Sequence, residues 1–163
     1  MKSGGNKAMS KAGNKIAGTY QVSPAAGYAG DVVPATAWKI LSEQSDAVLV
    51  DVRTRPEWNY VGLPDLGPLG RKPVLLEWQI FPTMQPNPDF VSALAGAVAD
   101  KDAPLLFLCR SGARSAAAAK AMTAAGYSTC INVTDGFEGP LDAQARRGAA
   151  AGWKAAGLPW RQT

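Results

Sequence analysis

The chain has 163 residues, of which 47% are hydrophobic and 18% are charged, and its formal net charge is +4. This length and apolar content predict one folded domain with its own core. No stretch approaches the roughly 18 consecutive apolar residues of a membrane-spanning helix, and two cysteines without any histidine are too few ligands for a structural zinc site.

Residues 1–19 are rich in Gly, Ser, Asn and Lys and hold too few apolar side chains to fold, which predicts a flexible basic tail. Its four lysines account for the whole net charge, because the 13 remaining Lys and Arg balance 13 Asp and Glu. No aromatic or amphipathic pattern separates these lysines, so we expect a solvated tail and no nucleic-acid or membrane partner. Contact of the tail with one of these is the alternative. The tail also lacks the apolar core of a secretory signal. With only two cysteines in the chain, a reducing, cytoplasmic location fits best.

Residues 20–163 form the predicted domain, in which strand-like and helix-like stretches alternate. Residues 32–33 indicate a short strand, and residues 34–43 a helix, because proline suits a first helical turn. Residues 47–52 form a nearly continuous apolar run with β-branched side chains, which is typical of a central parallel strand. Asp51 interrupts this run, and a buried carboxylate requires a partner.

The middle of the chain is richer in turn-forming residues. Residues 55–73 contain seven Pro and Gly residues and are predicted to be a loop. Residues 74–80 indicate another strand, with Glu77 and Trp78 near its C-terminal end, where active sites of open α/β sheets gather. The sequence leaves open whether Trp78 lines a pocket or packs in the core. Residues 88–99 predict an amphipathic helix. Its apolar positions recur at helical spacing: Phe90, Val91, Leu94 and Val98.

The most informative stretch begins at residues 105–108, a short apolar block that predicts a strand buried on both faces. Cys109 ends this strand. The alanine-rich residues 116–125 predict a helix, which Gly126 stops. Backbone N–H groups of a loop that leads into a helix N-terminus point at one spot and bind anions. We therefore expect Cys109 to lie at the mouth of such a nest, close to two arginines.

A cysteine in that setting ionises more readily than an ordinary thiol, and the thiolate is the nucleophile. Because the chain contains no histidine, a Cys–His pair is excluded and the loop itself must activate the sulfur. The plainer interpretation is a small buried residue that ends a strand, but the two arginines, two serines and a glycine that follow favour a reactive cysteine. Cys130, in the strand-like residues 129–133, is expected to pack in the core. A resolving thiol for Cys109 is the alternative.

Residues 109–115, Cys-Arg-Ser-Gly-Ala-Arg-Ser, follow an apolar strand and precede an alanine-rich helix. Together with the Asp-Val-Arg strand of residues 48–53, and with residues 132–139 and 153–159, they resemble the rhodanese (thiosulfate sulfurtransferase) family in order and spacing. The resemblance is to a single-domain rhodanese-like protein. It implies an α/β domain of three layers, with a central, mostly parallel sheet flanked by helices on both faces. The alternation of predicted strands and helices agrees with this.

Two segments depart from the family pattern. Residues 55–73 lack the His-Ile-Pro-Gly-Ala type of turn, which leaves the wall that contacts the sulfur acceptor undefined. Residues 140–151 are an insertion that ordinary single-domain rhodaneses lack. Its Arg146 and Arg147 are candidates to steer an anionic donor or to contact a partner protein, against the plainer interpretation of a solvated segment.

The resemblance implies that Cys109 takes sulfur from a small anionic donor such as thiosulfate and passes it, as a persulfide, to a thiol or to cyanide. No metal or organic cofactor is implied. Asp51 and Arg53 would brace the loops, and the donor would be bound by the remaining loop residues: Arg110, Ser111, Gly112, Ala113, Arg114 and Ser115. One alternative is a sulfur-carrier or non-catalytic module that acts with sulfur-relay protein partners. The other is a Cys-based phosphatase or arsenate reductase; the related phosphatases have one residue more between Cys and Arg than the four found here.

Overall fold

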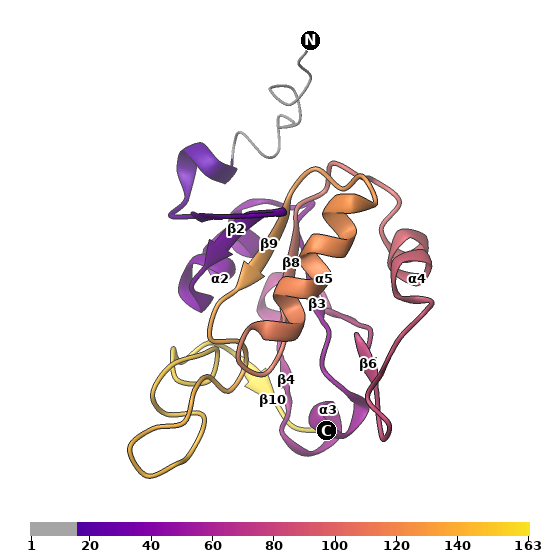
Figure 1. Ribbon diagram of the computed structural model, residues 1–163. Coiled ribbons are helices and arrows are strands. Elements are labelled where there is room, and N and C mark those ends of the chain that lie inside the picture. Colours follow the sequence, from indigo (N-terminus) through magenta and orange to yellow (C-terminus); the bar gives the residue numbers. More distant parts are fainter. Residues whose placement is uncertain (1–15) are drawn as a thin grey trace.

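The computed structural model describes residues 16–163, which are arranged around a six-stranded sheet (Figure 1). The strands follow one another across the sheet in the order β1–β2–β9–β8–β3–β5. Their bounds are Ser23–Ala25 for β1, Tyr28–Val32 for β2, Val48–Asp51 for β3, Val74–Leu75 for β5, Leu105–Leu108 for β8 and Cys130–Val133 for β9. The β1–β2 pair is antiparallel and every other neighbouring pair is parallel, which confirms the predicted mostly parallel sheet.

Helices and two short antiparallel strand pairs surround this sheet. Besides the helical residues 16–19, the helices are α2 (Pro34–Glu43), α3 (Arg55–Tyr60), α4 (Phe90–Ala97), α5 (Ala113–Ala124) and the 3-10 helix η2 (Gly67–Leu69). The strand pairs join β4 (Leu63–Pro64) to β10 (Trp160–Arg161), and β6 (Gln79–Ile80) to β7 (Gln85–Pro86).

Side chains along β8 alternate between two layers of the core. Leu106 and Leu108 pack in a cluster with buried residues of α2. Leu105 and Phe107 pack in a second cluster with buried residues of α4 and α5, and Cys109 continues on that side. Figure 1 shows α5 in front of the sheet, with α4 to its right and α2 behind the sheet. Helices on both faces of the sheet confirm the predicted three-layer, rhodanese-like fold.

Helix α3 lies inside residues 55–73, which were predicted to be a loop, so that prediction is wrong at its start. Thr54 and Glu57 form a capping box, in which the Thr54 N–H donates to Glu57 Oε1 at 3.1 Å, and Pro56 occupies the first turn. The Thr-x-x-Glu signal was present in the sequence. The many Pro and Gly residues that follow this signal favoured the prediction of a loop, and the short helix α3 was therefore missed.

The predicted strand over residues 74–80 is interrupted, because β5 ends at Leu75 and β6 begins at Gln79. Trp78 lies between them and packs edge-on against Phe90, with ring centroids 4.9 Å apart at an angle of 85°. Of the two interpretations left open for Trp78, the structure therefore favours packing. In α4, Phe90 and Leu94 are buried, whereas Val91 is 39% exposed and does not face the core.

The structure describes only the last residues of the predicted tail. Residues 1–15 of the predicted tail lie outside the described residues. Residues 16–19 are helical and Ile16 is buried in the core, so the folded part begins before the predicted start at residue 20. No helix within residues 16–163 has the length and apolar character needed to cross a membrane.

Residues 140–151 form an irregular segment that projects from the domain beside β10 (Figure 1). Arg147 is tied to its base, because its Nη1 donates to the Gly139 carbonyl oxygen at 2.7 Å. Arg146 is exposed. Of the two candidate arginines of this segment, Arg146 is therefore the one presented to solvent.

Candidate active site

The connection from β8 to α5 is tighter than predicted. Helix α5 begins at Ala113, three residues before the expected start at residue 116, so residues 109–112 make the whole loop. Gly112 is the N-cap residue and has a φ of 119°, which favours glycine. Arg114 and Ser115 consequently belong to the first helical turn.

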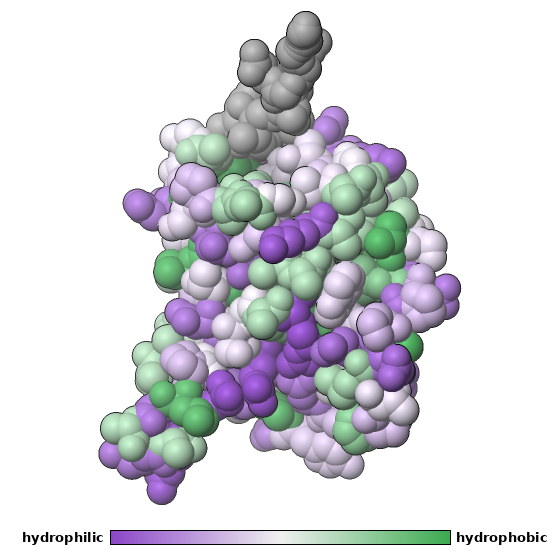
Figure 2. All heavy atoms as spheres, viewed as in Figure 1, coloured by the Kyte–Doolittle hydropathy of each residue, from purple (hydrophilic) through white to green (hydrophobic). Residues whose placement is uncertain are grey.

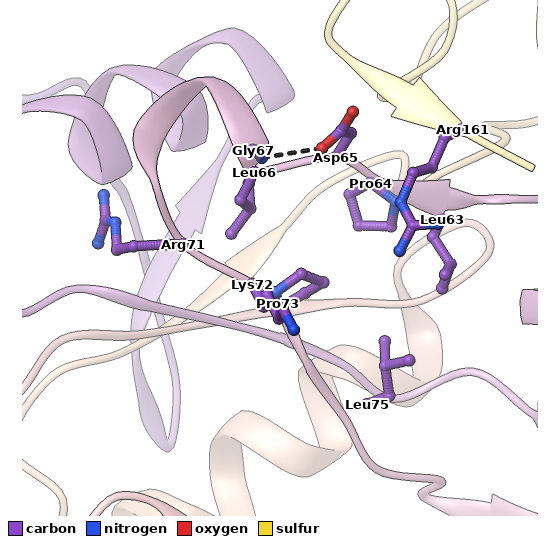
Figure 3. A pocket seen from close by; sticks show the side chains of 10 residues that line it. All are labelled: Leu63, Pro64, Asp65, Leu66, Gly67, Arg71, Lys72, Pro73, Leu75 and Arg161. Carbon is purple, nitrogen blue, oxygen red and sulfur yellow. Dashed lines mark hydrogen bonds between the residues drawn. The ribbon is translucent and has the colours of Figure 1, made fainter.

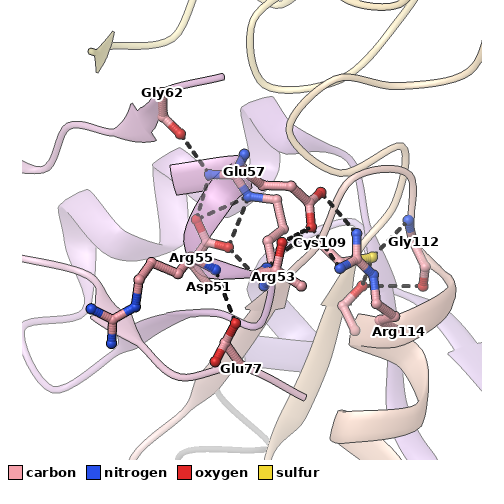
Figure 4. A network of polar contacts seen from close by, with 11 residues as sticks. Asp51, Arg53, Arg55, Glu57, Gly62, Glu77, Cys109, Gly112 and Arg114 are labelled. Carbon is pink, nitrogen blue, oxygen red and sulfur yellow. Dashed lines mark hydrogen bonds and ion pairs between the residues drawn. The ribbon is translucent and has the colours of Figure 1, made fainter. Parts of the chain in front are cut away.

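The sulfur of Cys109 faces the N-terminal end of α5 (Figure 4). The Gly112 N–H donates to Sγ at 3.1 Å, and Ser115 Oγ lies 3.2 Å from Sγ. The first N–H groups of a helix have no partner within it, and the helix dipole favours negative charge there. Only 1% of Cys109 is exposed. A negatively charged sulfur at this position would therefore be stabilised by backbone donors in surroundings that water barely reaches.

The second cysteine lies away from this loop. Cys130 begins β9 and pairs in register with Leu105, four residues before Cys109. This offset corresponds to more than about 10 Å along the sheet, whereas a disulfide requires Cα atoms within about 7 Å. Burial raises the pKa of the Cys130 thiol to about 11, although a hydrogen bond with Thr123 opposes this. Cys130 packs in the core and is not placed to resolve Cys109.

Arg114, which is predicted to bind the sulfur donor, forms an ion pair with a carboxylate. Its Nη1 and Nη2 donate to Oε1 and Oε2 of Glu57 at 2.8 and 2.9 Å, which joins α5 to α3. Burial alone would raise the pKa of Glu57, but hydrogen bonds from Arg114 and Thr54 outweigh it and lower the pKa to about 2. The ion pair gives Arg114 a part in the support of the loop, and its role in donor binding stays a prediction.

We expect the Glu57→Gln variant to lose a pH-dependent part of its stability. The ordinary pKa of the Glu57 carboxyl is 4.5 and the folded pKa is about 2, so the stabilisation is fully present above about pH 4.5 and disappears as the pH falls through 2. The Glu57 side chain is 19% exposed, so screening by solvent reduces an upper limit of about 3 kcal/mol to roughly 1 kcal/mol.

Urea unfolding of both proteins between about pH 2 and about pH 7 measures this difference. The wild-type free energy of unfolding should fall more steeply with acidification than that of Glu57→Gln. Parallel pH dependences of the two proteins would contradict the assigned ion pair.

Asp51 and Arg53 form a buried ion pair behind the loop (Figure 4). Arg53 Nη2 donates to Asp51 Oδ2 and to the Gly62 carbonyl oxygen, each at 2.8 Å. The Arg53 guanidinium stacks over the Phe137 ring, 4.2 Å from its centroid, and the Phe137 N–H donates to the Cys109 carbonyl oxygen at 2.8 Å. This chain of contacts connects the end of β3 to the backbone of the cysteine.

Three of the other residues predicted to bind the donor lie at the surface. Arg110, Ser111 and Ala113 are exposed, whereas Ser115 is buried. The Arg110 carbonyl oxygen accepts hydrogen bonds from the N–H groups of residues 138 and 139 at 3.0 and 3.1 Å, which anchors the loop to the turn after β9. Figure 2 shows hydrophilic side chains gathered below the N-terminal end of α5. The surface near the start of α5 is therefore polar.

Three polar residues that were not predicted to belong to the site lie behind Ser115. Ser115 Oγ is 2.6 Å from Asn132 Oδ1, and Asn132 Nδ2 donates to Asp31 Oδ1 at 3.0 Å. The Tyr28 hydroxyl donates to the same carboxylate oxygen at 2.8 Å. The available signal was a polar Asn inside the apolar strand of residues 130–133. The structure extends the surroundings of Cys109 across β9 to β2.

A separate cavity of about 300 Å³ lies between the β4–β10 pair and the residues that lead into β5 (Figure 3). Lys72 and Arg161 contribute positive charge to its wall. Arg71, also in the wall, is directed elsewhere, because its Nη1 donates to the Ala47 carbonyl oxygen at 2.7 Å. Cys109 does not line this cavity, which is therefore distinct from the site at the sulfur.

Comparisons with known proteins agree with this architecture. The family model of the STR4 middle domain matches residues 30–163. The crystal structure of Rv0390 from M. tuberculosis is 50% identical and superposes with a TM-score of 0.77, over 83% of this chain and 99% of that one. The uncharacterized protein RC0915 of Rickettsia conorii is 42% identical over 126 residues, or 77% of this chain and 91% of its own. The polysulfide-sulfur transferase homodimer from Wolinella succinogenes, 24% identical with a TM-score of 0.54 over 82% and 78% of the two chains, shares the fold.

Proposed function

The chain belongs to the STR4 middle-domain family, and from this premise we propose that it is a sulfurtransferase that carries sulfane sulfur as a persulfide on Cys109. The observation that carries the proposal is the position of Sγ against the Gly112 N–H, at the N-terminal end of α5. Such surroundings suit a sulfur that is an anion before and after transfer. The fold shared with a polysulfide-sulfur transferase is compatible with this chemistry.

The reaction would proceed in two displacements. The Cys109 thiolate attacks the outer sulfur of thiosulfate. A bond forms between Sγ and this outer sulfur, and the sulfur–sulfur bond of thiosulfate breaks. Sulfite leaves with that electron pair, and the outer sulfur of the persulfide carries the negative charge. An acceptor thiolate, or cyanide, then attacks this outer sulfur and takes it, which restores the Cys109 thiolate. In each step the transferred sulfur leaves one nucleophile and bonds to another, so no oxidant or cofactor is needed.

Arg110 is the arginine that we propose to bind the donor, because it is exposed beside the sulfur while Arg114 is paired with Glu57. We expect Arg110→Gln to raise the KM for thiosulfate about tenfold, with little change in kcat, since a charge-assisted contact to a dianion is lost. Increasing ionic strength should raise the wild-type KM and affect the variant less.

Steady-state kinetics with thiosulfate, compared with a Lys39→Gln control on α2, measures this effect. Lys39 is exposed, so the control removes one positive charge elsewhere and should keep the wild-type KM. An unchanged KM in Arg110→Gln would remove Arg110 from donor binding.

A second candidate function is a sulfur carrier that receives sulfur from one protein and delivers it to another. The observation that favours it is a cavity of about 540 Å³ beside α3, whose lining includes Tyr60, Ile80 and Phe81. Tyr60 is 80% exposed and Phe81 is 54% exposed. Exposed aromatic residues around a hollow are typical of surfaces that bind another protein.

A phosphatase or arsenate reductase is the least favoured alternative. Four residues separate Cys109 from Arg114, and the arginine that would cradle a phosphate is paired with Glu57. We therefore expect no hydrolysis of a generic aryl phosphate under conditions in which sulfur transfer is measurable.

Thiocyanate formation from thiosulfate and cyanide tests the proposed function. Turnover would support a sulfurtransferase that accepts free thiosulfate. Transfer only from a persulfidated protein donor would indicate the carrier function instead. Absence of transfer from either donor would contradict both.

A further inference from the structure

We propose that Asp31 and Asn132 are positioning residues that turn the Ser115 hydroxyl proton away from Cys109 and so restrain the reactivity of the resting cysteine. The proposal concerns the same site and rests on the proposed role of Cys109 as the nucleophile. It adds a chain of buried contacts across β2, β9 and α5 that decides which way one hydroxyl group points.

Ser115 has three possible acceptors for one proton. Its Oγ lies 2.6 Å from Asn132 Oδ1, 3.1 Å from the Gly112 carbonyl oxygen and 3.2 Å from Cys109 Sγ. A hydroxyl donates only one hydrogen bond. Because Asn132 Oδ1 cannot donate, the short contact to it requires the Ser115 proton. The lone pairs of Oγ then face Sγ, which suits a neutral S–H donor and disfavours a thiolate.

Asp31 fixes the orientation of the Asn132 amide. Asn132 Nδ2 lies 3.0 Å from Asp31 Oδ1, and an ionised carboxylate can only accept hydrogen bonds. The NH₂ group must therefore face Asp31, which leaves the amide oxygen for Ser115. Tyr28 supports the same arrangement, because burial and its hydrogen bond to Asp31 raise the pKa of its hydroxyl and keep it a donor. Asn132 is 5% exposed, so water has little access to exchange these partners.

Replacing Asp31 by asparagine removes this constraint with little change of shape. Two amides can pair in either orientation, so Asn132 can turn its NH₂ group toward Ser115 Oγ. The Ser115 hydroxyl is then released to donate to Sγ, which favours the thiolate. We expect Asp31→Asn to speed alkylation of Cys109 by iodoacetamide about three- to tenfold near neutral pH.

A double-mutant cycle separates this effect from the simple loss of a negative charge. The cycle compares wild type, Asp31→Asn, Ser115→Ala and the double variant, with the alkylated cysteine located by peptide mass mapping. If the relay of contacts from Asp31 through Asn132 to Ser115 sets the rate, Asp31→Asn should speed alkylation only when Ser115 is present. A through-space effect of the lost charge would also appear in the Ser115→Ala background. Asn132→Ala breaks the relay at its middle and supplies a second background, should Ser115→Ala not fold. Asp46→Asn removes an exposed carboxylate in the turn before β3 and should keep the wild-type rate.

At alkaline pH, where the thiol is ionised in each protein, the rates of wild type and Asp31→Asn should converge. The other charged pairs near the loop, Arg114 with Glu57 and Arg53 with Asp51, are unchanged in all these variants. An Asp31→Asn rate equal to that of wild type, or an equal acceleration in the Ser115→Ala or Asn132→Ala background, would overturn the proposal. Alkylation needs no sulfur donor, so this outcome is independent of whether thiosulfate is a substrate.

Discussion

Replacing Cys109 by serine should abolish sulfur transfer to the uncatalysed background and leave the fold intact. The hydroxyl of serine occupies nearly the same volume and can accept from the Gly112 N–H, which donates to Sγ at 3.1 Å in the wild-type protein. A serine oxygen cannot form a persulfide, so the covalent intermediate is lost and binding alone remains. Thiocyanate formation and urea unfolding, measured on the same preparation, report on the two properties separately.

Cys130→Ala is the matched control, because it removes the other thiol of the chain. Cys130 is buried in β9 away from the loop, so this variant should lose about 1 kcal/mol of stability and keep its activity. Residual transfer by Cys109→Ser, or loss of transfer in a folded Cys130→Ala, would assign the chemistry to a different residue.

The Asp51→Asn variant should be strongly destabilised, with a loss of about 3–5 kcal/mol in the free energy of unfolding. Both side chains of the Asp51–Arg53 pair are fully buried, and their N–O distance is 2.8 Å. Asparagine keeps the shape and an acceptor oxygen but removes the negative charge. The Arg53 guanidinium would then stay buried without a counter-charge.

Urea unfolding at neutral pH measures this loss, and Asp46→Asn is its control. Asp46 is exposed in the turn before β3, so its replacement should change stability by less than about 0.5 kcal/mol. The Asp51→Asn variant should also lose activity at temperatures where it stays folded, since Arg53 contacts Phe137, whose N–H bonds the Cys109 carbonyl oxygen. Equal stability of Asp51→Asn and Asp46→Asn would contradict the stabilising role of the buried pair.

Local patterns were enough to predict the centre of the molecule. The apolar runs that became β3 and β8 are buried strands, and the alanine-rich stretch after Cys109 is helix α5. These patterns also predicted that the cysteine would lie where a strand leads into a helix. Strand type, burial and helix propensity are properties of neighbouring residues, so a single sequence reveals them.

The partners of the site residues could not be predicted in the same way. Glu57 and Arg114 are 57 positions apart, and Asp31 and Asn132 are 101 positions apart. Such pairs depend on the order of strands in the sheet, which brings β2 beside β9. The sequence places Arg114 near Cys109 and so suggests donor binding, but it does not reveal the ion pair of Arg114 with Glu57. The capping box at Thr54 is the one local signal that could have placed Glu57 on a helix.

The persulfide on Cys109 is the central claim, and intact-mass analysis tests it most directly. Reduced protein exposed to thiosulfate and freed of excess reagent should gain the mass of one sulfur atom, and peptide mapping should place that sulfur on Cys109. A thiol or cyanide should then remove it, and Cys109→Ser should gain nothing. A wild-type protein that gains no sulfur from either thiosulfate or a persulfidated protein donor, or that gains it on Cys130, would contradict the claim.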